Sequence, residues 1–496
     1  MRFPLRWKLS VAVLLLTPRP SPAAPPPGIR EFRRAHEEAI VKELAELVAL
    51  PNVASDGPGV ERNAERLVAM LKKRGLAPRL LRVEGAPPAV FGERRVPGAK
   101  STVLLYAHYD GQPAVAAEWQ TPPWTPVLRL AGREVPLAAP FDPEARLHGR
   151  SSSDDKAPIV AMLAALDALA ASGRAPAVNL KLLFEGEEEK GSPHLRELLG
   201  RHRELLACDL LLLCDGPVHQ SRRPLLYLGA RGVTDLEVTV YGPSKALHSG
   251  HYGSWAPNPA LLLAHLLASL RGADGTVLVR GFQEDVRPPT AAERSAAAAA
   301  PDVEAELRAS LGLAADPKTP PLAEGLLLPA INVRGMSAGH VGAEAQNAVP
   351  TEARASLDFR LVPDQTPENV RRRVEEHLAA GGWTVVHEAP GAEARARPRL
   401  VLLQWGHGYP PARTPLDAPA AQRVVRVARQ ALGDVVVLPT LGGSIPMYVF
   451  QEVLGAPVVG VPIVNHDNNQ HAANENLRLQ NLWDGLELFA ALFLEL

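Results

Sequence analysis

The chain has 496 residues, more than one hydrophobic core usually organises, so we expect two domains. Lysine and arginine number 53 against 54 for aspartate and glutamate, and the formal charge of -1 excludes broad attraction for nucleic acid or anionic membranes. Only Cys208 and Cys214 are cysteines, which excludes a disulfide framework and a cysteine-type zinc cluster. Any bound metal must therefore use histidine and carboxylate ligands.

The first residues have the order of a secretory signal. Basic residues precede an apolar run over residues 9–16, and small residues follow at Ala23 and Ala24. The run is shorter than the roughly 20 apolar residues that span a bilayer, so a cleaved signal is favoured over a membrane anchor. We expect a signal peptide over residues 1–24, export to the periplasm or beyond the cell, and no membrane insertion of the mature protein.

Helices and apolar strands alternate in the first half of the chain. Helical spacing of apolar residues predicts helices over residues 31–50 and 60–74, and a third after Ala157. Apolar runs that read TVLLYAHYD, LKLLFEGEEE and LLLLCDGP predict buried strands. This alternation indicates an α/β fold with a mainly parallel sheet flanked by helices. Ligands in such sheets gather at the carboxyl ends of the strands, where each of these runs carries acidic residues or histidine.

After about Gly229 the pattern changes to alternating stretches typical of half-exposed strands, with a helical segment near each. From about Val401 helix and apolar strand return, and an amphipathic helix over residues 479–496 ends the chain. We therefore predict an α+β domain over residues 231–400, inserted into a catalytic domain that residues 25–230 and 401–496 form.

The first polar cluster is HYD, in which His108 and Asp110 project to the same side because side-chain direction in a strand repeats every two residues. His108 could face a metal while Asp110 orients it, as outer carboxylates commonly do. The alternative is a hydrogen-bonded structural histidine, which is the more frequent reading of a lone motif.

The second cluster is GRSSSDDKAP, where Asp154 and Asp155 stand side by side before an apolar helix. Two neighbouring carboxylates at the end of a buried strand are costly unless cations compensate for them. The alternative is a helix N-cap, for which aspartate is well suited. Both interpretations hold if one carboxylate bridges metals and the other supports the turn.

Further acidic residues and histidines follow later strands. FEGEEEKGS places Glu185, Glu187, Glu188 and Glu189 after a strand too apolar to lie on the surface. Asp215 follows four leucines and would be a buried, unpaired charge without a partner. His466 and His471 lie in a polar loop before the last helix.

Together these clusters supply enough hard and borderline ligands for two divalent cations. Zinc accepts histidine nitrogen and carboxylate oxygen, and paired ions commonly share a bridging group. We expect two divalent metal ions per subunit, zinc in the first place, with manganese or cobalt as alternatives. Such a site suits hydrolysis of an amide bond, with a glutamate as general base.

The motifs HYDGQP, GRSSSDDKAP, EGEEEKGS, CDG, ALHSG, FRLVP, GGSIP and QHAANE, in that order, resemble the carnosinase, glutamate carboxypeptidase and aminoacylase group of di-zinc metallopeptidases, peptidase family M20. The resemblance implies that His108 and Asp215 hold one ion, that Glu189 and His471 hold the other, and that Asp154 bridges them. It also implies Glu188 as general base, Asp110 behind His108, and a cis peptide between Asp154 and Asp155.

The same resemblance implies that the inserted domain dimerises and acts as a lid. His248 of ALHSG would then reach the partner's site and stabilise the oxyanion, and Arg360 of FRLVP would clamp the substrate's terminal carboxylate. Gly443 and Ser444 would line the pocket, and His407 is a further candidate for substrate contact. The alternatives are a surface histidine beside a turn for His248 and a solvent-facing arginine for Arg360.

Specificity follows from two positions. Asp at position 215 is similar to the dipeptidase and aminopeptidase branch of the group, so we expect cleavage of dipeptides or short peptides. Thr440 and Leu441 stand where the relatives closest to carnosinase carry Arg-Glu. Because this chain lacks those charges, which could recognise a free amino terminus, a deacylase of N-acyl amino acids or a carboxypeptidase remains an alternative. A metal-binding or peptide-binding protein without catalysis is the third hypothesis, and an intact Glu188 disfavours it.

Overall fold

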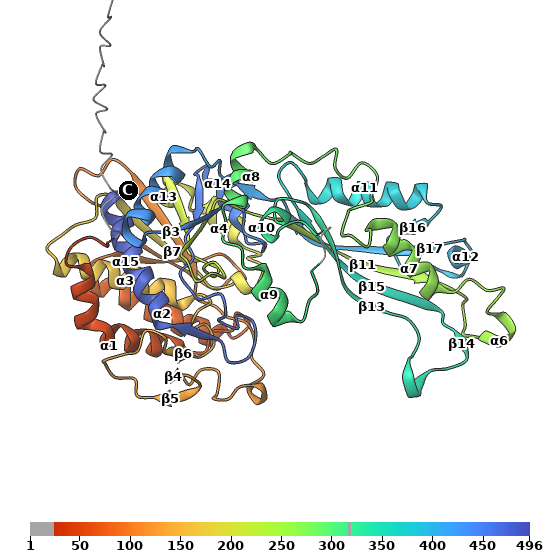
Figure 1. The fold of residues 1–496 in the computed structure, drawn as a ribbon, viewed down its shortest axis with the longest axis horizontal. Helices are drawn as coiled ribbons and strands as arrows, with labels where there is room; N and C mark the ends of the chain where they lie inside the picture. The colour runs from red at the N-terminus through yellow and green to blue at the C-terminus, as the bar shows by residue number, and fades with distance from the viewer. Residues whose placement is uncertain (1–23, 316–318) are drawn as a thin grey trace, which may run out of the picture.

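A computed structural model describes residues 24–315 and 319–496 (Figure 1). The predicted signal peptide, apart from Ala24, lies outside the described residues, so it stays a prediction. Within the described ranges, no helix combines the length and the apolar character needed to cross a membrane.

The larger unit is built on one eight-stranded sheet with the strand order β1-β2-β7-β3-β8-β20-β9-β19. Its strands are β1 (Ala77–Leu81), β2 (Ala89–Arg94), β7 (Asn179–Glu185), β3 (Thr102–His108), β8 (Leu210–Leu213), β20 (Val458–Gly460), β9 (Leu225–Tyr227) and β19 (Val436–Leu438). The central neighbours β7, β3, β8 and β20 run parallel, and antiparallel pairs occur towards both sides. The three predicted strands β3, β7 and β8 are therefore present and adjacent.

Helices cover both faces of this sheet. Side chains of β3 point alternately to the two faces, and each face is buried in a separate hydrophobic core. Leu105 and Ala107 join the core on one face, and Leu104 and Tyr106 join the core on the other. The first face carries α1 (Ile29–Val48), α2 (Gly57–Lys73), α3 (Lys156–Ala171), α13 (Pro419–Leu432) and α15 (Leu479–Glu495). The second face carries α4 (Leu195–Arg201), α5 (Arg203–Leu206) and α14 (Met447–Leu454).

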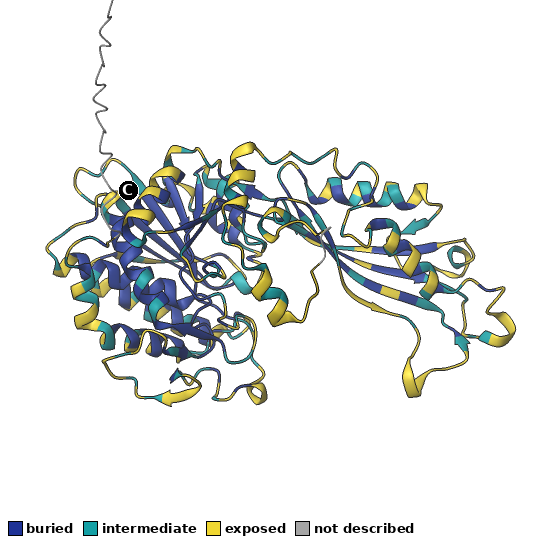
Figure 2. Ribbon diagram, in the orientation of Figure 1, coloured by how far each residue is buried: buried dark blue, intermediate teal, exposed yellow. Residues whose placement is uncertain are grey.

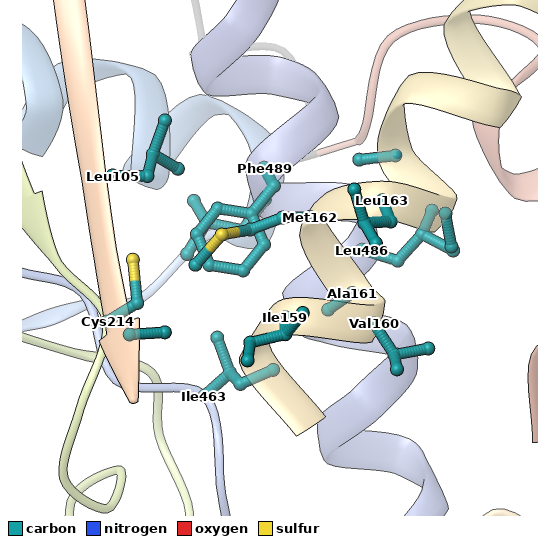
Figure 3. Packing of buried hydrophobic residues seen from close by; sticks show 14 of the residues in the cluster. Leu105, Ile159, Val160, Ala161, Met162, Leu163, Cys214, Ile463, Leu486 and Phe489 are labelled. Carbon is teal, nitrogen blue, oxygen red and sulfur yellow. The ribbon is translucent and has the colours of Figure 1, made fainter. Parts of the chain in front are cut away.

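Helix α3 is apolar all round because it packs between α1, α15 and the sheet. Figure 3 shows Met162 of α3 beside Phe489 of α15, with Leu105 of β3 close by. The C-terminal helix thus completes the core that the first half of the chain begins.

The smaller unit is a five-stranded sheet with the order β13-β15-β11-β17-β16, extended to one side of the larger unit (Figure 1). Its strands are β13 (Ala330–Ser337), β15 (Glu352–Leu361), β11 (Gly232–Tyr241), β17 (Leu400–Tyr409) and β16 (Thr384–Val386). Helices α7 (Pro259–Leu270) and α11 (Pro367–Ala380) share its core, and the burial of β11 mostly alternates as predicted. Figure 2 shows the yellow, exposed residues that remain along these strands.

The remaining elements are short. They are β4 (Val127–Leu130), β5 (Arg133–Val135), β6 (Arg146–His148) and β21 (Asn476–Arg478) in one sheet, the pairs β10 (Gly229–Ala230) with β18 (Ala412–Arg413) and β12 (Leu247–His248) with β14 (Ala348–Val349), the helices α6 (Ser249–Tyr252), α8 (Ala291–Ala298), α9 (Glu304–Leu311), α10 (Leu322–Gly325) and α12 (Ala392–Arg395), and the single turns η1 (Ala116–Glu118), η2 (Glu188–Lys190) and η3 (Gly342–Glu344). Helices α8, α9 and α10 lie between the two units (Figure 1).

The predicted fold class, a mainly parallel α/β sheet flanked by helices with a separate α+β unit, is confirmed. The predicted boundary at residue 400 falls on the first residue of β17, which pairs with β11 of the smaller sheet as far as Tyr409. The assignment of the two units as catalytic and dimerisation domains stays a prediction.

Candidate metal centre

The candidate ligands come from five distant stretches that meet at one edge of the main sheet. His108 is the last residue of β3, Asp215 lies just after β8, and Glu189 lies in η2 just after β7. Asp154 precedes α3, and His471 lies in the loop between β20 and β21. The carboxyl ends of neighbouring parallel strands share an edge of the sheet. The topology alone therefore brings together His108, Glu189 and Asp215, which lie at or just after the ends of β3, β7 and β8.

These residues form two groups with one member in common. The ligand atoms of His108, Asp154 and Asp215 lie within 4.8 Å of one another, as do those of Asp154, Glu189 and His471. One carboxylate oxygen of Asp154 lies 3.0 Å from Nε2 of His108, and the other lies 3.2 Å from Nε2 of His471. Asp154 therefore offers one oxygen to each group, which is the arrangement that a bridging ligand requires.

The electrostatics of the cluster favour binding of cations among its carboxylates. Burial, and then the neighbouring Asp154, raise the pKa of Asp215 to about 6. Hydrogen bonds that His471 donates to Asp154 and Glu189 raise its pKa to about 10. Within the described residues, the ion pairs of Asp154 are to imidazoles and none is to lysine or arginine. Such a concentration of buried carboxylate is costly when ionised unless cations compensate for it, and histidine with carboxylate is a donor set that zinc accepts.

Asp110 and Asp155 hold the first group in place from behind. Asp110 lies 3.3 Å from Nδ1 of His108 and accepts hydrogen bonds from the backbone N–H groups of Glu188 and Glu189. Asp155 accepts a hydrogen bond from the backbone N–H of His108. The peptide bond between Asp154 and Asp155 is cis, as the resemblance implied.

Glu475 is a supporting residue that the sequence did not reveal. This fully buried carboxylate accepts hydrogen bonds from the backbone N–H groups of Ser151, Ser153 and Asp154, and from the side chain of Arg150. It therefore fixes the loop that presents Asp154. A polar loop of asparagines surrounds it in the sequence, so no local pattern separated it from its neighbours.

Tyr227 gives similar support to Asp215. The hydroxyl of Tyr227 donates to the backbone carbonyl of Asp215 over 2.8 Å. The ring lies against Gly460, where an added Cβ would come within 2.1 Å of it. Only glycine at position 460 leaves room for this contact between β9 and β20.

The acidic run after β7 divides into different environments. Glu185 is buried, accepts a hydrogen bond from Tyr106, and has a pKa raised by burial to about 8. Glu187 pairs with His194 on the other side of the turn. Glu188 lines the main cavity, and burial raises its pKa well above the ordinary value. Of the four glutamates, Glu188 is thus the one placed to act on a substrate without also belonging to a candidate metal group.

A cavity of about 970 Å³ opens beside the cluster and extends to the smaller unit. Asp154, Glu188, Asp215 and His471 line one side, and the predicted substrate residues Arg360, Gly443 and Ser444 line another. Arg360 of β15 donates to Asp358 over 3.0 Å and to the hydroxyl of Ser444 over 2.8 Å.

Arg231 is a second cation near Arg360 that the sequence did not reveal. Its Nε donates to the carbonyl oxygen of Gly442 over 3.0 Å, and burial together with the charge of Arg360 lowers its pKa to about 10. Two guanidinium groups therefore face one buried carboxylate, Asp358, and leave net positive charge at this end of the cavity.

Three predicted histidines lie outside the cluster. His248 is exposed next to α6, at the end of the smaller unit far from the main sheet (Figure 1). His407 is exposed on β17 and does not line the cavity. His466 belongs to neither metal group, so of the two histidines in that loop only His471 meets Asp154 and Glu189. The roles of His248 and His407 stay predictions.

Comparison with known proteins agrees with this geometry. Peptidase family M20/M25/M40 matches residues 104–495. The chain is 27% identical to a Cys-Gly metallodipeptidase of Schizosaccharomyces pombe, over 93% of this chain and 96% of that protein. It is also 27% identical to human Beta-Ala-His dipeptidase, over 98% of this chain and 97% of that protein.

Among solved structures, an M20 family metallo-carboxypeptidase from Sulfolobus solfataricus superposes with a TM-score of 0.74 at 29% identity. That alignment covers 92% of this chain and 98% of the other. The matches span the main sheet and the smaller unit alike, so they concern the whole architecture.

We expect Glu475→Gln to destabilise the protein and to lower its metal content. Glutamine lacks the charge that compensates for the buried Arg150, and unpairing a buried ion typically costs about 3 kcal/mol or more. The free energy of unfolding from denaturant titration and the metal stoichiometry from elemental analysis measure both effects. The control Glu452→Gln, at a half-exposed ion pair with Arg196, should change neither. Unchanged stability and metal content in Glu475→Gln would contradict the supporting role.

Proposed function

Because the chain belongs to peptidase family M20/M25/M40, it is a peptidase, and we propose that it cleaves dipeptides or short peptides with two divalent cations per subunit. The observation that carries the proposal is the carboxylate of Asp154, whose two oxygens face His108 and His471 separately. The names of the similar yeast and human proteins, both dipeptidases, support the substrate class.

His108, Asp154 and Asp215 would hold one cation, and Asp154, Glu189 and His471 the other. When bound, zinc or a similar cation supplies positive charge that polarises a substrate carbonyl and makes water more acidic. Asp110 keeps the imidazole of His108 turned towards the cluster, because it lies on the Nδ1 side while Nε2 faces Asp154.

Glu188 is the proposed general base. Its carboxylate lines the cavity beside Asp154 and Asp215, and Asp110 fixes its backbone N–H. In this role a carboxylate oxygen of Glu188 takes the proton from the attacking water and then gives it to the leaving amine nitrogen.

Arg360 is the proposed contact for the substrate's terminal carboxylate. It faces the cavity from the smaller unit, and Ser444 and Asp358 fix its guanidinium group. Arg231 adds positive charge behind it. Together they place a free carboxyl end between the two units, as cleavage near the end of a short chain requires.

The smaller unit is the proposed dimerisation surface. Trp255, Met336 and Val341 are large apolar side chains that it exposes, with 80%, 51% and 86% of their surface accessible. Large exposed apolar side chains of this kind are candidates for burial against a partner. A partner subunit would also explain His248, because its own chain holds it far from the metal centre (Figure 1).

An N-acyl amino acid deacylase or a carboxypeptidase on the same scaffold is the second candidate. The similarity to the Sulfolobus metallo-carboxypeptidase favours it, as does a cavity near the upper end of the range found for drug-sized ligands. Both candidates use the same metal centre and the same carboxylate contact.

We expect metal-dependent hydrolysis of at least one substrate class among dipeptides, amino-blocked dipeptides and N-acyl amino acids. Chelation should abolish turnover, and added zinc should restore it. Glu188→Gln should retain its metal while turnover falls by about a hundredfold or more, as loss of a general base implies. Glu197→Gln, at an exposed ion pair on α4, is the control. Full activity in Glu188→Gln would remove the proposed base.

We expect mixed dimers to reveal a shared site. His248→Ala subunits and Glu188→Gln subunits are each impaired, but a heterodimer contains one site with both groups intact. Mixing should therefore restore activity towards the value for one working site per dimer, measured after subunit exchange. Absence of rescue in a verified heterodimer would mean that His248 does not act across the interface.

Export is the last part of the proposal, supported by the signal-like order of residues 1–24. Expression in a host with a secretory pathway should give a mature protein that begins near Pro25, measured by N-terminal sequencing of the exported fraction. An unprocessed chain that stays in the cytosol would contradict it.

A further inference from the structure

The cavity beside the metal centre has an apolar section that the proposed chemistry does not use. Leu225, Leu438, Leu441 and Ile445 line it from the larger unit, and Ala300 and Leu326 line it from the segment with α8, α9 and α10. These side chains pack at the edge of the second core or between the two units, yet they also face the cavity. An apolar wall that is open to solvent favours an apolar ligand.

The loop over residues 441–444 fixes where this section lies relative to the reacting bond. At one end, the hydroxyl of Ser444 accepts the hydrogen bond from Arg360. At the other end, Leu441 lies 3.8 Å from the position that a Cβ on Gly216 would take, directly after Asp215. Leu326 closes over the next residue, 2.9 Å from where a Cβ on Gly442 would lie. The loop thus runs from the carboxylate contact to an apolar end beside the metal centre.

A substrate held at both points must direct its other end towards Leu441. When the substrate's carboxylate lies at Arg360 and its carbonyl lies at the metal centre, the group on the acyl side of the scissile bond extends into the apolar section of the cavity. The carboxylates of α9 and its flanks in this part of the wall are already engaged within the chain: Glu304 accepts from Leu322 and Arg308, and Asp302 accepts from the backbone N–H of Glu304.

The other polar side chains in this part of the wall are neutral or at the rim. Burial lowers the pKa of His219, which keeps its imidazole uncharged at neutral pH. Glu324 lines the cavity but is exposed on α10, where water screens it. This wall therefore binds an apolar group of the substrate more favourably than a charged group.

We propose that this enzyme prefers substrates with a large apolar group on the acyl side of the scissile bond. An apolar N-terminal residue and an apolar acyl chain share this chemistry, and the cavity accepts it in the same section. The inference rests on the proposed function, because it takes the carboxylate contact and the metal centre as fixed points.

The test compares two substrate series on the zinc-loaded, full-length enzyme. One series is X-Gly, with glycine, alanine, leucine and phenylalanine as X, and the other is N-acylglycine, with acetyl, butyryl and octanoyl chains. We expect kcat/KM, measured as release of glycine, to rise by up to about fourfold for each added methylene, and Leu-Gly to exceed Gly-Gly at least about tenfold. Whichever series is turned over identifies the source of the apolar group.

Leu441→Asn should lower the ratio of kcat/KM for the largest to the smallest substrate by about tenfold. A general structural defect would lower both values alike, so the ratio isolates the contact. Leu326→Asn is the second variant should the first fold poorly, and Leu278→Asn, at an exposed leucine outside the cavity, should keep the wild-type ratio.

The outcomes separate this inference from the proposed function. If neither series is hydrolysed in a metal-dependent way, the proposed function fails. If hydrolysis occurs but small or charged acyl-side groups are favoured, or if Leu441→Asn and Leu326→Asn leave the ratio unchanged, the inference is wrong and the proposed function stands.

Discussion

Negative charge buried at the carboxyl ends of parallel strands is the constraint on which the rest of this structure depends. Asp154, Asp155, Asp215 and Glu188 lie close enough for their charges to interact, and His108 and His471 are the groups that face them. Imidazoles alone leave this much buried carboxylate poorly compensated. The two groups of candidate ligands could hold the proposed pair of divalent cations, which would compensate for this charge and supply the chemistry that hydrolysis of an amide bond needs.

The supporting contacts follow from the same constraint. Ligands that converge from distant stretches must be held before the cations arrive, because each misplaced donor weakens binding and catalysis. Asp110 therefore joins β3 to the turn after β7, Glu475 fixes the loop of Asp154, and Tyr227 holds the backbone at Asp215. In each case one candidate ligand is fixed by a group from a different stretch, so the metal centre also ties the sheet, the loop after β20 and α3 together.

Residues that belong to a local sequence pattern could be predicted, whereas residues whose partners lie far away along the chain could not. His108, Glu189 and Asp215 could be identified because each comes after an apolar run that ends in polar residues, and Asp154 because it stands beside a second aspartate just before an apolar helix. Glu475 could not, since its partner Ser153 is 322 positions away and its own neighbourhood is a plain polar loop. Arg231 was hidden in the same way, because only the folded chain brings it to the carbonyl of Gly442 and beside Arg360. The proposed role of His248 involves a second chain, so the structure of one chain leaves it a prediction.

Substrate choice and catalysis are separable in this architecture because different parts of the chain carry them. The metal groups belong to the main sheet, whereas Arg360 comes from β15 and Leu326 from the segment between the units. Leu441 belongs to neither candidate metal group and its side chain approaches the residue after Asp215, so changing that side chain alters the wall of the cavity without removing a candidate ligand. Leucine at position 441 is therefore compatible with both candidate metal groups. The expected consequence of this apolar side chain is the proposed preference on the acyl side of the bond, with the residues of the candidate metal groups unchanged.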